Sequence, residues 1–282
     1  MQIKELNEFI KNALKEDLGN GDHTSLASIN KNKESKANLL IKDNGIIAGI
    51  KLAELIFKSF DSKLKISKNF KDGEVVKNGD IAFSLQGKAI SILSCERLAL
   101  NCMQKMSAIA TKTYKLTKLI SHTKCKLLDT RKTAPLNRII EKWAVEIGGG
   151  INHRFGLYDM IMIKDNHIDF AGGISQAISK TQNYLLKNKL KLDIIVEARN
   201  LSEVKEILSN KGIKRILLDN FNYKMTKLAV DLIEDKCETE SSGGITENTI
   251  IKYAECGVDY ISVGALTNSL NNFDLSLKAI KN

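Results

Sequence analysis

The stretch that decides the fold spans residues 126–147 and reads KLLDTRKTAPLNRIIEKWAVEI. It opens with a short apolar run, passes through charged and hydroxyl residues, and ends in a segment whose apolar positions recur with the period of an amphipathic helix. A short buried strand followed by a helix is the repeating unit of a parallel sheet covered by helices. The pattern therefore predicts an α/β fold wherever it recurs.

The same alternation continues beyond this stretch. The expected strands are Lys126–Thr130, Leu157–Ile163, Leu192–Val196, Arg215–Leu218, Cys237–Ser241 and Val258–Val263. The expected helices are Leu136–Ile147, Ile174–Leu186, Leu201–Leu208, Lys224–Ile233 and Thr246–Cys256. Because so few units cannot complete an eight-fold barrel, we predict an incomplete α/β barrel of six to seven strands. A doubly wound open sheet is the alternative.

The first ninety or so residues follow another pattern. Helical stretches at Ile3–Leu14 and Leu52–Phe60 stand beside a mostly apolar run from Asn38 to Ile50, and the Asx-Gly pairs Asp72-Gly73 and Asn78-Gly79 are turn signals between strands. This part is predicted to be an α+β sandwich domain, followed by a long helix from Ile92 to about Ile120. We predict an N-terminal domain with this linking helix at 1–110, the barrel at 111–270, and a C-terminal segment at 271–282 that packs back on the N-terminal domain.

Composition excludes several classes of protein. The 282 residues are 43% hydrophobic and 27% charged, which is typical of globular proteins, and no apolar run approaches the ~18 residues of a membrane span. The first residues lack the features of a secretory signal, so we expect a cytoplasmic protein. The five cysteines form no CxxC pair, which favours free, buried thiols over disulfides or a zinc site.

The net charge of +10 fits nucleic acid, a membrane surface or small anionic substrates. Lysines are spread along the whole chain and aromatic residues make up only 6%, a distribution that disfavours a nucleic-acid binder. Of the 43 basic residues only six are arginines, which suggests that these serve for their planar, bidentate grip on carboxylate or phosphate. The six are Arg97, Arg131, Arg138, Arg154, Arg199 and Arg215.

Active sites of α/β barrels lie at the carboxyl ends of the strands, and here those ends are polar. The first two strands supply the cations Arg131, Lys132 and Lys164, which are joined by the pair His153-Arg154 on the preceding loop. The next two strands supply Glu197 and Asp219, carboxylates that suit a hydrated Mg²⁺ or the hydroxyls of a sugar.

The last two strands end in small residues, Ser242-Gly243-Gly244 and Gly264-Ala265. Their backbone N–H groups, together with a helix predicted to start at Thr246, are suited to cradle a phosphate. The whole set indicates a polyanionic ligand that carries a sugar and travels with magnesium.

Simpler explanations exist for each residue. Arg131 and Arg154 could form surface salt bridges, and Glu197 and Asp219 could cap the helices that follow them. Lys164 would be costly to bury unpaired, so a ligand contact or a Schiff base is favoured; a Schiff-base aldolase is thus a second class of enzyme to consider. We expect His167 and His23 to be structural.

Seven ordered motifs, running from about residue 13 to residue 270, closely resemble quinolinate phosphoribosyltransferase, the decarboxylating nicotinate-nucleotide pyrophosphorylase. They are Glu16-Asp17-Leu18-Gly19 with Gly21-Asp22 and Thr24, Glu96-Arg97-Leu98-Ala99-Leu100-Asn101, Asp129-Thr130-Arg131-Lys132-Thr133, Gly148-Gly149-Gly150 leading to Asn152-His153-Arg154, Lys164-Asp165-Asn166-His167, Ser242-Gly243-Gly244-Ile245, and Val263-Gly264-Ala265-Leu266-Thr267. In one departure, Ala134-Pro135-Leu136-Asn137-Arg138 stands where the family usually carries Thr-Pro-Gly-Leu-Arg.

The resemblance implies a reaction of quinolinate with 5-phosphoribosyl 1-pyrophosphate and Mg²⁺ that yields nicotinate mononucleotide, pyrophosphate and CO₂. It implies a homodimer in which Arg97 reaches the neighbouring site, and catalytic roles for Lys132, Lys164, Glu197 and Asp219, the last two also near the metal. The substrate-binding residues it implies are Arg97, Thr130, Arg131, Lys132, Thr133, His153, Arg154, Lys164, Glu197, Asp219, Ser242, Gly243, Gly244, Val263, Gly264 and Ala265. A nicotinate phosphoribosyltransferase or the molybdenum-associated paralogue is the rival within the fold, although so many cations suit a dicarboxylate better.

Overall fold

The structure, a computed structural model, describes residues 3–268 and 270–280. The chain forms two compact units. The first unit lies within residues 1–114, 133–149 and 266–282, and the second within residues 115–132 and 150–265. Each unit is therefore made of several segments of the chain. The domain boundaries expected from the sequence stay predictions.

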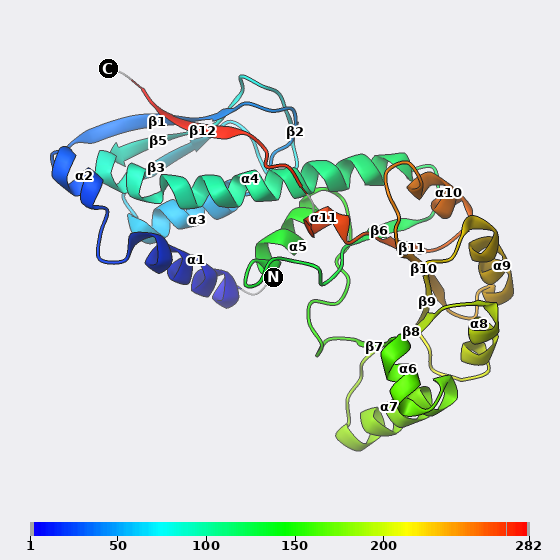
Figure 1. The fold of residues 1–282 in the computed structure, drawn as a ribbon. Coiled ribbons are helices and arrows are strands. Elements are labelled where there is room, and N and C mark those ends of the chain that lie inside the picture. The colour runs from blue at the N-terminus through cyan, green and yellow to red at the C-terminus, as the bar shows by residue number, and fades with distance from the viewer. Residues whose placement is uncertain (1–2, 269, 281–282) are drawn as a thin grey trace. The chain divides into compact units, whose positions relative to one another are not determined.

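The second unit is built on a six-stranded parallel sheet with the order β6-β11-β10-β9-β8-β7 (Figure 1). Its strands are β6 (Lys126–Leu128), β7 (Ile161–Ile163), β8 (Ile194–Ala198), β9 (Arg215–Asp219), β10 (Glu238–Ser242) and β11 (Tyr260–Ser262). Within this sheet, β6, the first of its strands in sequence, pairs with β11, the last, which is the order of a barrel; in a doubly wound sheet the strand order reverses instead. Within the described residues β6 and β7 do not pair, so the barrel is incomplete as predicted.

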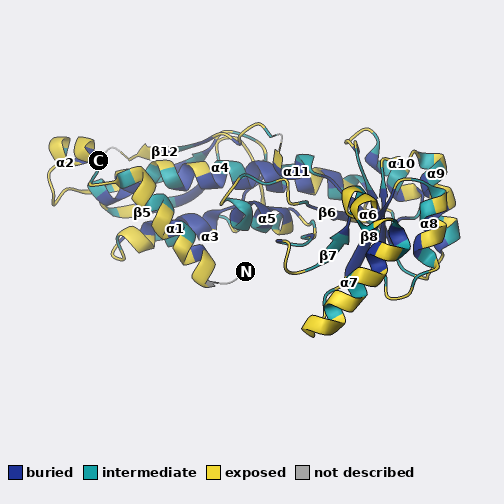
Figure 2. Cartoon of the chain, turned by 60° about the horizontal axis from the view of Figure 1, so that its bottom comes forward, coloured by how far each residue is buried: buried dark blue, intermediate teal, exposed yellow. Residues whose placement is uncertain are grey.

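Helices follow the strands in order: α6 (Asp165–Ala171), α7 (Ile174–Asn188), α8 (Leu201–Leu208), α9 (Tyr223–Ile233) and α10 (Ile250–Glu255). Figure 2 shows their exposed outer faces beside strands that are mostly buried. The sequence prediction missed α6. The strand predicted at Leu157–Ile163 is also too long, because the Asp159 carboxylate accepts hydrogen bonds from the N–H groups of Phe155 and Gly156 and bends residues 155–159 into a turn.

The first unit contains an antiparallel sheet with the order β12-β1-β5-β3 and a short pair, β2 and β4. These strands are β1 (Glu34–Ile41), β2 (Gly45–Ile46), β3 (Lys65–Lys68), β4 (Val75–Val76), β5 (Ile81–Lys88) and β12 (Leu275–Ala279). The remaining helices of the chain are α1 (Ile3–Leu18), α2 (His23–Ser28), α3 (Ile50–Phe60), α4 (Ala89–Leu119), α5 (Arg138–Ile147) and α11 (Ala265–Asn268). Because β12 pairs with β1, the C-terminal strand completes the N-terminal sheet.

The long helix α4 supplies hydroxyl groups to the buried backbone of the first unit. Ser107 Oγ accepts a hydrogen bond from the Ala48 N–H at 3.0 Å and donates to the Ala48 carbonyl at 3.1 Å. One turn further on, Thr111 Oγ1 accepts from the Ile46 N–H at 2.9 Å. Leaving such buried backbone groups unsatisfied costs ~1–3 kcal/mol each, so these two side chains anchor the segment between β2 and α3.

The five cysteines are free thiols, and four of them are buried. Burial raises the pKa of Cys95, Cys102 and Cys125 to about 12 in each case. Because the thiolate is the reactive form, these side chains behave as apolar core residues at neutral pH.

The segment before α5 holds a side chain in a backbone conformation that favours glycine. Leu136 has a φ of +64° and its side chain is 92% exposed. The family pattern carries glycine at this place. A side chain in the left-handed region is strained, and this one has no burial to offset the strain.

We therefore expect Leu136→Gly to stabilise the protein by about 0.5–1 kcal/mol, because it relieves the strain without loss of packing. The matched control is Leu186→Gly, which removes the same side chain, 76% exposed, from the last turn of α7. That change should destabilise by about 1 kcal/mol. Thermal unfolding of both variants checks the pair, and a fall in melting temperature for Leu136→Gly would contradict the assignment of strain.

Candidate active site

The parallel sheet brings the predicted site residues of the second unit to one edge. Ile163 pairs with Val196 across β7 and β8, and Ser242 pairs with Asp219 across β10 and β9, so the strands end nearly level. The residues at or just beyond these ends, with the preceding loop, are Thr130, Arg131, Lys132, His153, Arg154, Lys164, Glu197, Asp219, Ser242, Gly243, Gly244, Val263, Gly264 and Ala265. We call this set the strand-end site.

Two of the predicted residues belong to the first unit. Arg97 is exposed on α4. Thr133 is partly buried, and its Oγ1 accepts a hydrogen bond from Arg138 Nε at 3.0 Å. Their roles in binding stay predictions.

Lys164 and Glu197 form an ion pair in the strand-end site. The Nζ atom of Lys164 lies 2.7 Å from Glu197 Oε2; the lysine side chain is 44% exposed and the glutamate side chain 6%. The backbone of Lys164 also begins α6, since its N–H donates to His167 Nδ1 at 2.9 Å. The expectation that His167 is structural agrees with this contact, and Lys164 remains reachable from solvent.

Glu197 and Asp219 do not cap the helices that follow them. The N-cap of α8 is Asn200, which accepts from the Glu203 N–H, and the N-cap of α9 is Asn222, which accepts from the Met225 N–H. The capping explanation for the two carboxylates is therefore wrong.

The two carboxylates share a face of the sheet. Glu197 pairs with Leu217, and Asp219 lies two residues further along β9, so both project to the same side. Asp219 is partly buried, and its Oδ2 accepts a hydrogen bond from Asn220 Nδ2 at 2.7 Å. Carboxylates at the ends of neighbouring strands can receive hydroxyl groups or a hydrated cation.

Arg154 and Arg131 form the cationic part of the site. Burial, together with the positive charge of Arg131, lowers the pKa of Arg154, while Asp159 opposes the shift. Arg154 Nη1 donates to the Met160 carbonyl at 3.2 Å, and the residue lines a cavity of about 420 Å³ beside β7, α6 and α7. In the part of the chain that the structure describes, neither arginine has an ion-pair partner within 4.0 Å, so surface salt bridges do not explain them.

At two glycines of the strand ends, Gly243 and Gly264, an added Cβ atom would crowd a neighbouring residue. Gly243 has a φ of +93°, and a Cβ atom added there would lie 2.9 Å from the Asn220 backbone nitrogen. A Cβ atom added to Gly264 would lie 2.9 Å from Lys132 Cδ. Backbone can therefore approach a ligand closely at these two places.

The helix predicted from Thr246 begins only at Ile250, because the Thr246 N–H donates to Thr249 Oγ1 and holds a turn. That part of the prediction was wrong. The backbone bend around Gly243 and Gly244, and not the dipole of a helix starting at Thr246, is what this end of the site offers to an anion.

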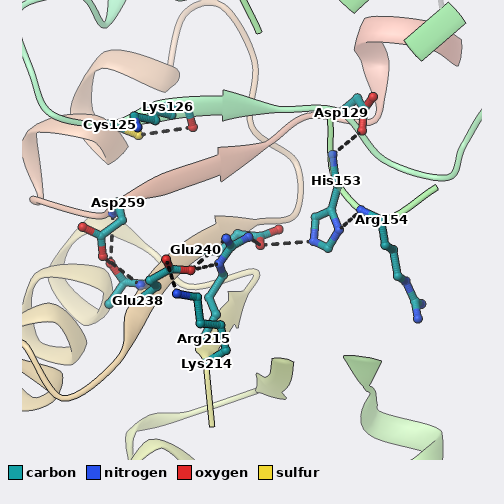
Figure 3. Close-up of polar contacts among 11 residues, drawn as sticks. Cys125, Lys126, Asp129, His153, Arg154, Lys214, Arg215, Glu238, Glu240 and Asp259 are labelled. Atoms are coloured by element: carbon teal, nitrogen blue, oxygen red, sulfur yellow. Dashed lines mark hydrogen bonds and ion pairs between the residues drawn. The ribbon is translucent and has the colours of Figure 1, made fainter. Parts of the chain in front are cut away.

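A buried polar network lies behind Arg154 (Figure 3). His153 donates its backbone N–H to Asp129 Oδ1 at 2.8 Å, and its ring Nδ1 accepts from the Arg154 N–H at 2.7 Å. Its Nε2 lies 3.3 Å from Glu240 Oε2, which is 2.9 Å from Arg215 Nη1. Burial alone would raise the pKa of Glu240, but its interactions with His153, Ser262 and Arg215, in that order, outweigh burial and lower it.

Sequence reasoning included Arg215 among the arginines suited to a paired grip on carboxylate or phosphate, but it did not find the partner Glu240, which it placed in an apolar strand. The available signal was the alternation in residues 237–241, CETES, where charged residues recur every second position in a strand expected to be buried. Such spacing places Glu238 and Glu240 on one face of the sheet.

The patterns of two domains of one protein family match the chain. The pattern of "Quinolinate phosphoribosyl transferase, C-terminal domain" covers residues 109–278, and that of "Quinolinate phosphoribosyl transferase, N-terminal domain" covers residues 22–107. The chain belongs to the quinolinate phosphoribosyltransferase family.

Members of this family resemble the chain over nearly its whole length. A "Quinolinate phosphoribosyltransferase [decarboxylating] 1b" of Nicotiana tabacum is 46% identical over 291 residues, covering 97% of this chain and 82% of the relative. A "Probable nicotinate-nucleotide pyrophosphorylase [carboxylating]" of Bacillus subtilis is 36% identical and covers 98% of this chain and 94% of the relative.

Solved structures of proteins from the same family also resemble the chain. NadC from Streptococcus pyogenes has a TM-score of 0.92 at 34% identity, covering 100% of this chain and 99% of that chain. The nicotinate-nucleotide pyrophosphorylase from Francisella tularensis has a TM-score of 0.92 at 36% identity, covering 99% and 98%. Human nicotinic acid phosphoribosyltransferase shares the fold alone, at 10% identity and a TM-score of 0.59.

Within residues 3–268 and 270–280, no helix is both long and apolar enough to cross a membrane. The same residues contain no cluster of three or more His, Cys, Asp or Glu side chains placed to hold a metal ion.

The buried network should matter for stability far more than an exposed ion pair. Arg215→Met leaves the fully buried Glu240 without its cation and should cost about 3–5 kcal/mol. The matched control, Arg199→Met, removes an exposed partner of Glu203 and should cost no more than about 1 kcal/mol. Chemical denaturation followed by circular dichroism measures both; equal losses would contradict the difference in burial.

Proposed function

We propose that the chain is a quinolinate phosphoribosyltransferase, which converts quinolinate and 5-phosphoribosyl 1-pyrophosphate into nicotinate mononucleotide, pyrophosphate and CO₂ for NAD biosynthesis. The observation that carries the proposal is the pair Arg131 and Arg154, close enough to depress the pKa of Arg154, at the same sheet edge as Glu197 and Asp219. The names of the relatives, which cover most of this chain, support the same reaction.

The cations suit a pyridine dicarboxylate. Two guanidinium groups with no ion-pair partner within 4.0 Å among the described residues are stabilised by a ligand that brings more than one negative charge, and a guanidinium can hold each carboxylate in a bidentate pair. We assign Arg131, Lys132, Arg154 and Lys164 to the quinolinate carboxylates and the neighbouring phosphate, and we keep the predicted substrate-binding roles of Thr130 and Thr133. A monocarboxylate such as nicotinate leaves part of this charge uncompensated.

The other side of the site suits the sugar and its phosphates. We assign Glu197 and Asp219 to the ribose hydroxyls. Ser242, Gly243, Gly244, Val263, Gly264 and Ala265 are assigned to the phosphate. Gly243 and Gly264 carry no side chain that would separate their backbone from a phosphate, and an added Cβ atom would lie 2.9 Å from the Asn220 nitrogen or from Lys132 Cδ.

Mg²⁺ is expected to arrive with the sugar pyrophosphate. Protein sites for this ion commonly supply one or two carboxylates and leave the other positions to water and phosphate, and the Glu197–Asp219 pair fits that donor set. When bound, the ion neutralises charge on the leaving pyrophosphate. Binding and orientation of the two substrates depend on the side chains of the protein.

In the reaction, the bond between ribose C1 and pyrophosphate breaks, and the electron pair leaves with pyrophosphate. The carboxylates of Glu197 and Asp219 stabilise the oxocarbenium-like ribose, while Lys132 and Lys164 compensate the departing charge. The pyridine nitrogen then bonds to C1 and becomes positive. The bond to the adjacent 2-carboxylate breaks, CO₂ leaves, and its electron pair enters the ring and is protonated, so the protein contributes mainly position and charge.

Three further features complete the proposal. The enzyme acts as a homodimer in which the exposed Arg97 of each chain reaches the neighbouring strand-end site. Its work takes place in the cytoplasm, although some plant relatives are described as chloroplastic or mitochondrial. Neither nucleic acid nor membrane takes part.

The deciding experiment mixes the purified protein and Mg²⁺ with phosphoribosyl pyrophosphate and either quinolinate or nicotinate. We expect equal amounts of CO₂ and pyrophosphate with quinolinate, and little pyrophosphate with nicotinate. Pyrophosphate release with nicotinate alone would overturn the proposal in favour of a nicotinate phosphoribosyltransferase. Borohydride trapping of Lys164 with a carbonyl substrate would instead indicate a Schiff-base enzyme.

Arg131→Lys should raise the KM for quinolinate ~10-fold or more although the charge is kept, because one ammonium cannot make the paired contact. The KM for phosphoribosyl pyrophosphate should change far less. Arg199→Lys, an exposed arginine paired with Glu203, is the control and should leave both values unchanged. A normal quinolinate KM in Arg131→Lys would remove Arg131 from the carboxylate site.

A further inference from the structure

The imidazole of His153 is occupied by the protein on both nitrogens. Nδ1 accepts the Arg154 backbone N–H at 2.7 Å, and Nε2 lies 3.3 Å from Glu240 Oε2. The residue is only 7% exposed, and in Figure 3 its ring sits between Arg154 and Glu240. The resemblance to the family assigned His153 to the substrate, yet its ring is committed to two internal partners.

These partners determine the protonation of the ring. An N–H group can donate only to a nitrogen that carries no proton, so Nδ1 is unprotonated. The single ring proton is therefore on Nε2, where it faces the carboxylate of Glu240. A doubly protonated ring would set its Nδ1–H against the Arg154 N–H at 2.7 Å. His153 is thus a buried spacer between the Arg154 backbone and the Glu240 carboxylate.

Glu240 is fixed in turn by Arg215. The carboxylate is fully buried and lies 2.9 Å from Arg215 Nη1, while Nε and Nη2 of the same guanidinium bond to Glu238 Oε2 at 3.1 and 2.9 Å. The guanidinium also lies 3.8 Å from the centre of the Tyr260 ring. With its three nitrogens and its flat face in contact, Arg215 has little freedom to move, and Glu240 is tied to β9 as well as to its own strand.

Arg154 needs such support because its loop has almost no secondary structure. Between α5 and β7 the only strand-like contact of the described residues is the isolated bridge from Ile151 to Leu128. His153 ties this loop to the end of β6 through Asp129 and to β10 through Glu240. The backbone N–H of Arg154 is hydrogen-bonded to the His153 ring. A displacement of the ring therefore also displaces the arginine.

Stability alone is a weak explanation for this buried ion pair, because apolar residues of similar volume are often as stable. What the charged pair adds is a fixed acceptor for one ring proton. We infer that Glu240 and Arg215 are positioning residues that act through His153 to hold Arg154 in place for the substrate carboxylate. The inference rests on the proposed function for the identity of that substrate, but not for the state of the ring.

The first test uses the unmodified protein with ¹⁵N-labelled histidine and nuclear magnetic resonance. The chain has four histidines, and replacing the exposed His23, His122 and His167 by glutamine one at a time identifies the His153 signals. We expect Nε2 to carry the proton and Nδ1 to carry none, both before and after saturation with quinolinate. A proton on Nδ1, or a change of protonation when quinolinate binds, would overturn the inference and return His153 to the substrate contacts.

The second test compares Glu240→Gln with Glu238→Gln. Each change removes one carboxylate from Arg215, but only Glu240 touches His153. Glu240→Gln should raise the KM for quinolinate ~10-fold or more with little change in the KM for phosphoribosyl pyrophosphate, because only Arg154 is displaced. Glu238→Gln should keep both values within about twofold.

Equal effects of the two variants, or an unchanged quinolinate KM in folded Glu240→Gln, would contradict the inference. If Glu240→Gln does not fold, the resonance experiment on the unmodified protein decides alone. If the unmodified protein releases no CO₂ from quinolinate, the proposed function fails, whereas the tautomer of His153 is still decided by the same spectra. The two failures are therefore distinguishable.

Discussion

The parallel register of the six-stranded sheet is the constraint on which the rest of the second unit depends. Residues as far apart in sequence as Lys132, Asp219 and Gly264 lie at one edge only because every strand runs in the same direction. The strands are short, and the carboxyl end of each one continues into a loop. Most of the predicted site residues lie at these strand ends or in these loops. An antiparallel sheet would divide the same residues between two edges.

The charged side chains form two layers, one at this edge of the sheet and one buried behind it. In the deeper layer, Arg215 is bonded to Glu238 and Glu240, so the cation and the carboxylates compensate one another without any ligand. At the edge itself, Arg131 and Arg154 have no such partner among the described residues, and each raises the energy of the other. An anionic ligand is thus attracted by the arginines of the outer layer, whereas the charges of the inner layer already compensate one another.

The sequence was sufficient to predict what depends on apolar periodicity. Strands such as Arg215–Leu218 and helices such as Leu201–Leu208 follow from their buried faces and were placed almost to the residue. The helix α6 was missed because its start depends on a single contact from Lys164 to His167, which has no apolar signature. The start of α10 was misplaced for a similar reason, since a threonine turn delays the helix. Roles in the site were harder still: the pair His153-Arg154 was recognised, but which of the two faces inward depends on Glu240, a residue far away in sequence.

The geometry of the guanidinium contacts, and not ligand binding alone, explains where the few arginines occur. Arg215 makes three hydrogen bonds to two carboxylates and lies over an aromatic ring, and a lysine ammonium has neither the spread of donors nor the flat face for this. Arg154 has the same need at the loop, where one nitrogen holds the Met160 carbonyl while the others remain for a ligand. Arg199 also contacts two carboxylates, those of Glu203 and Asp169, but its side chain is 43% exposed, so solvent screens these contacts. Arginine is therefore required where a cation must be held in one orientation, whether a substrate or a buried carboxylate is the partner, and lysine suffices where only charge is needed.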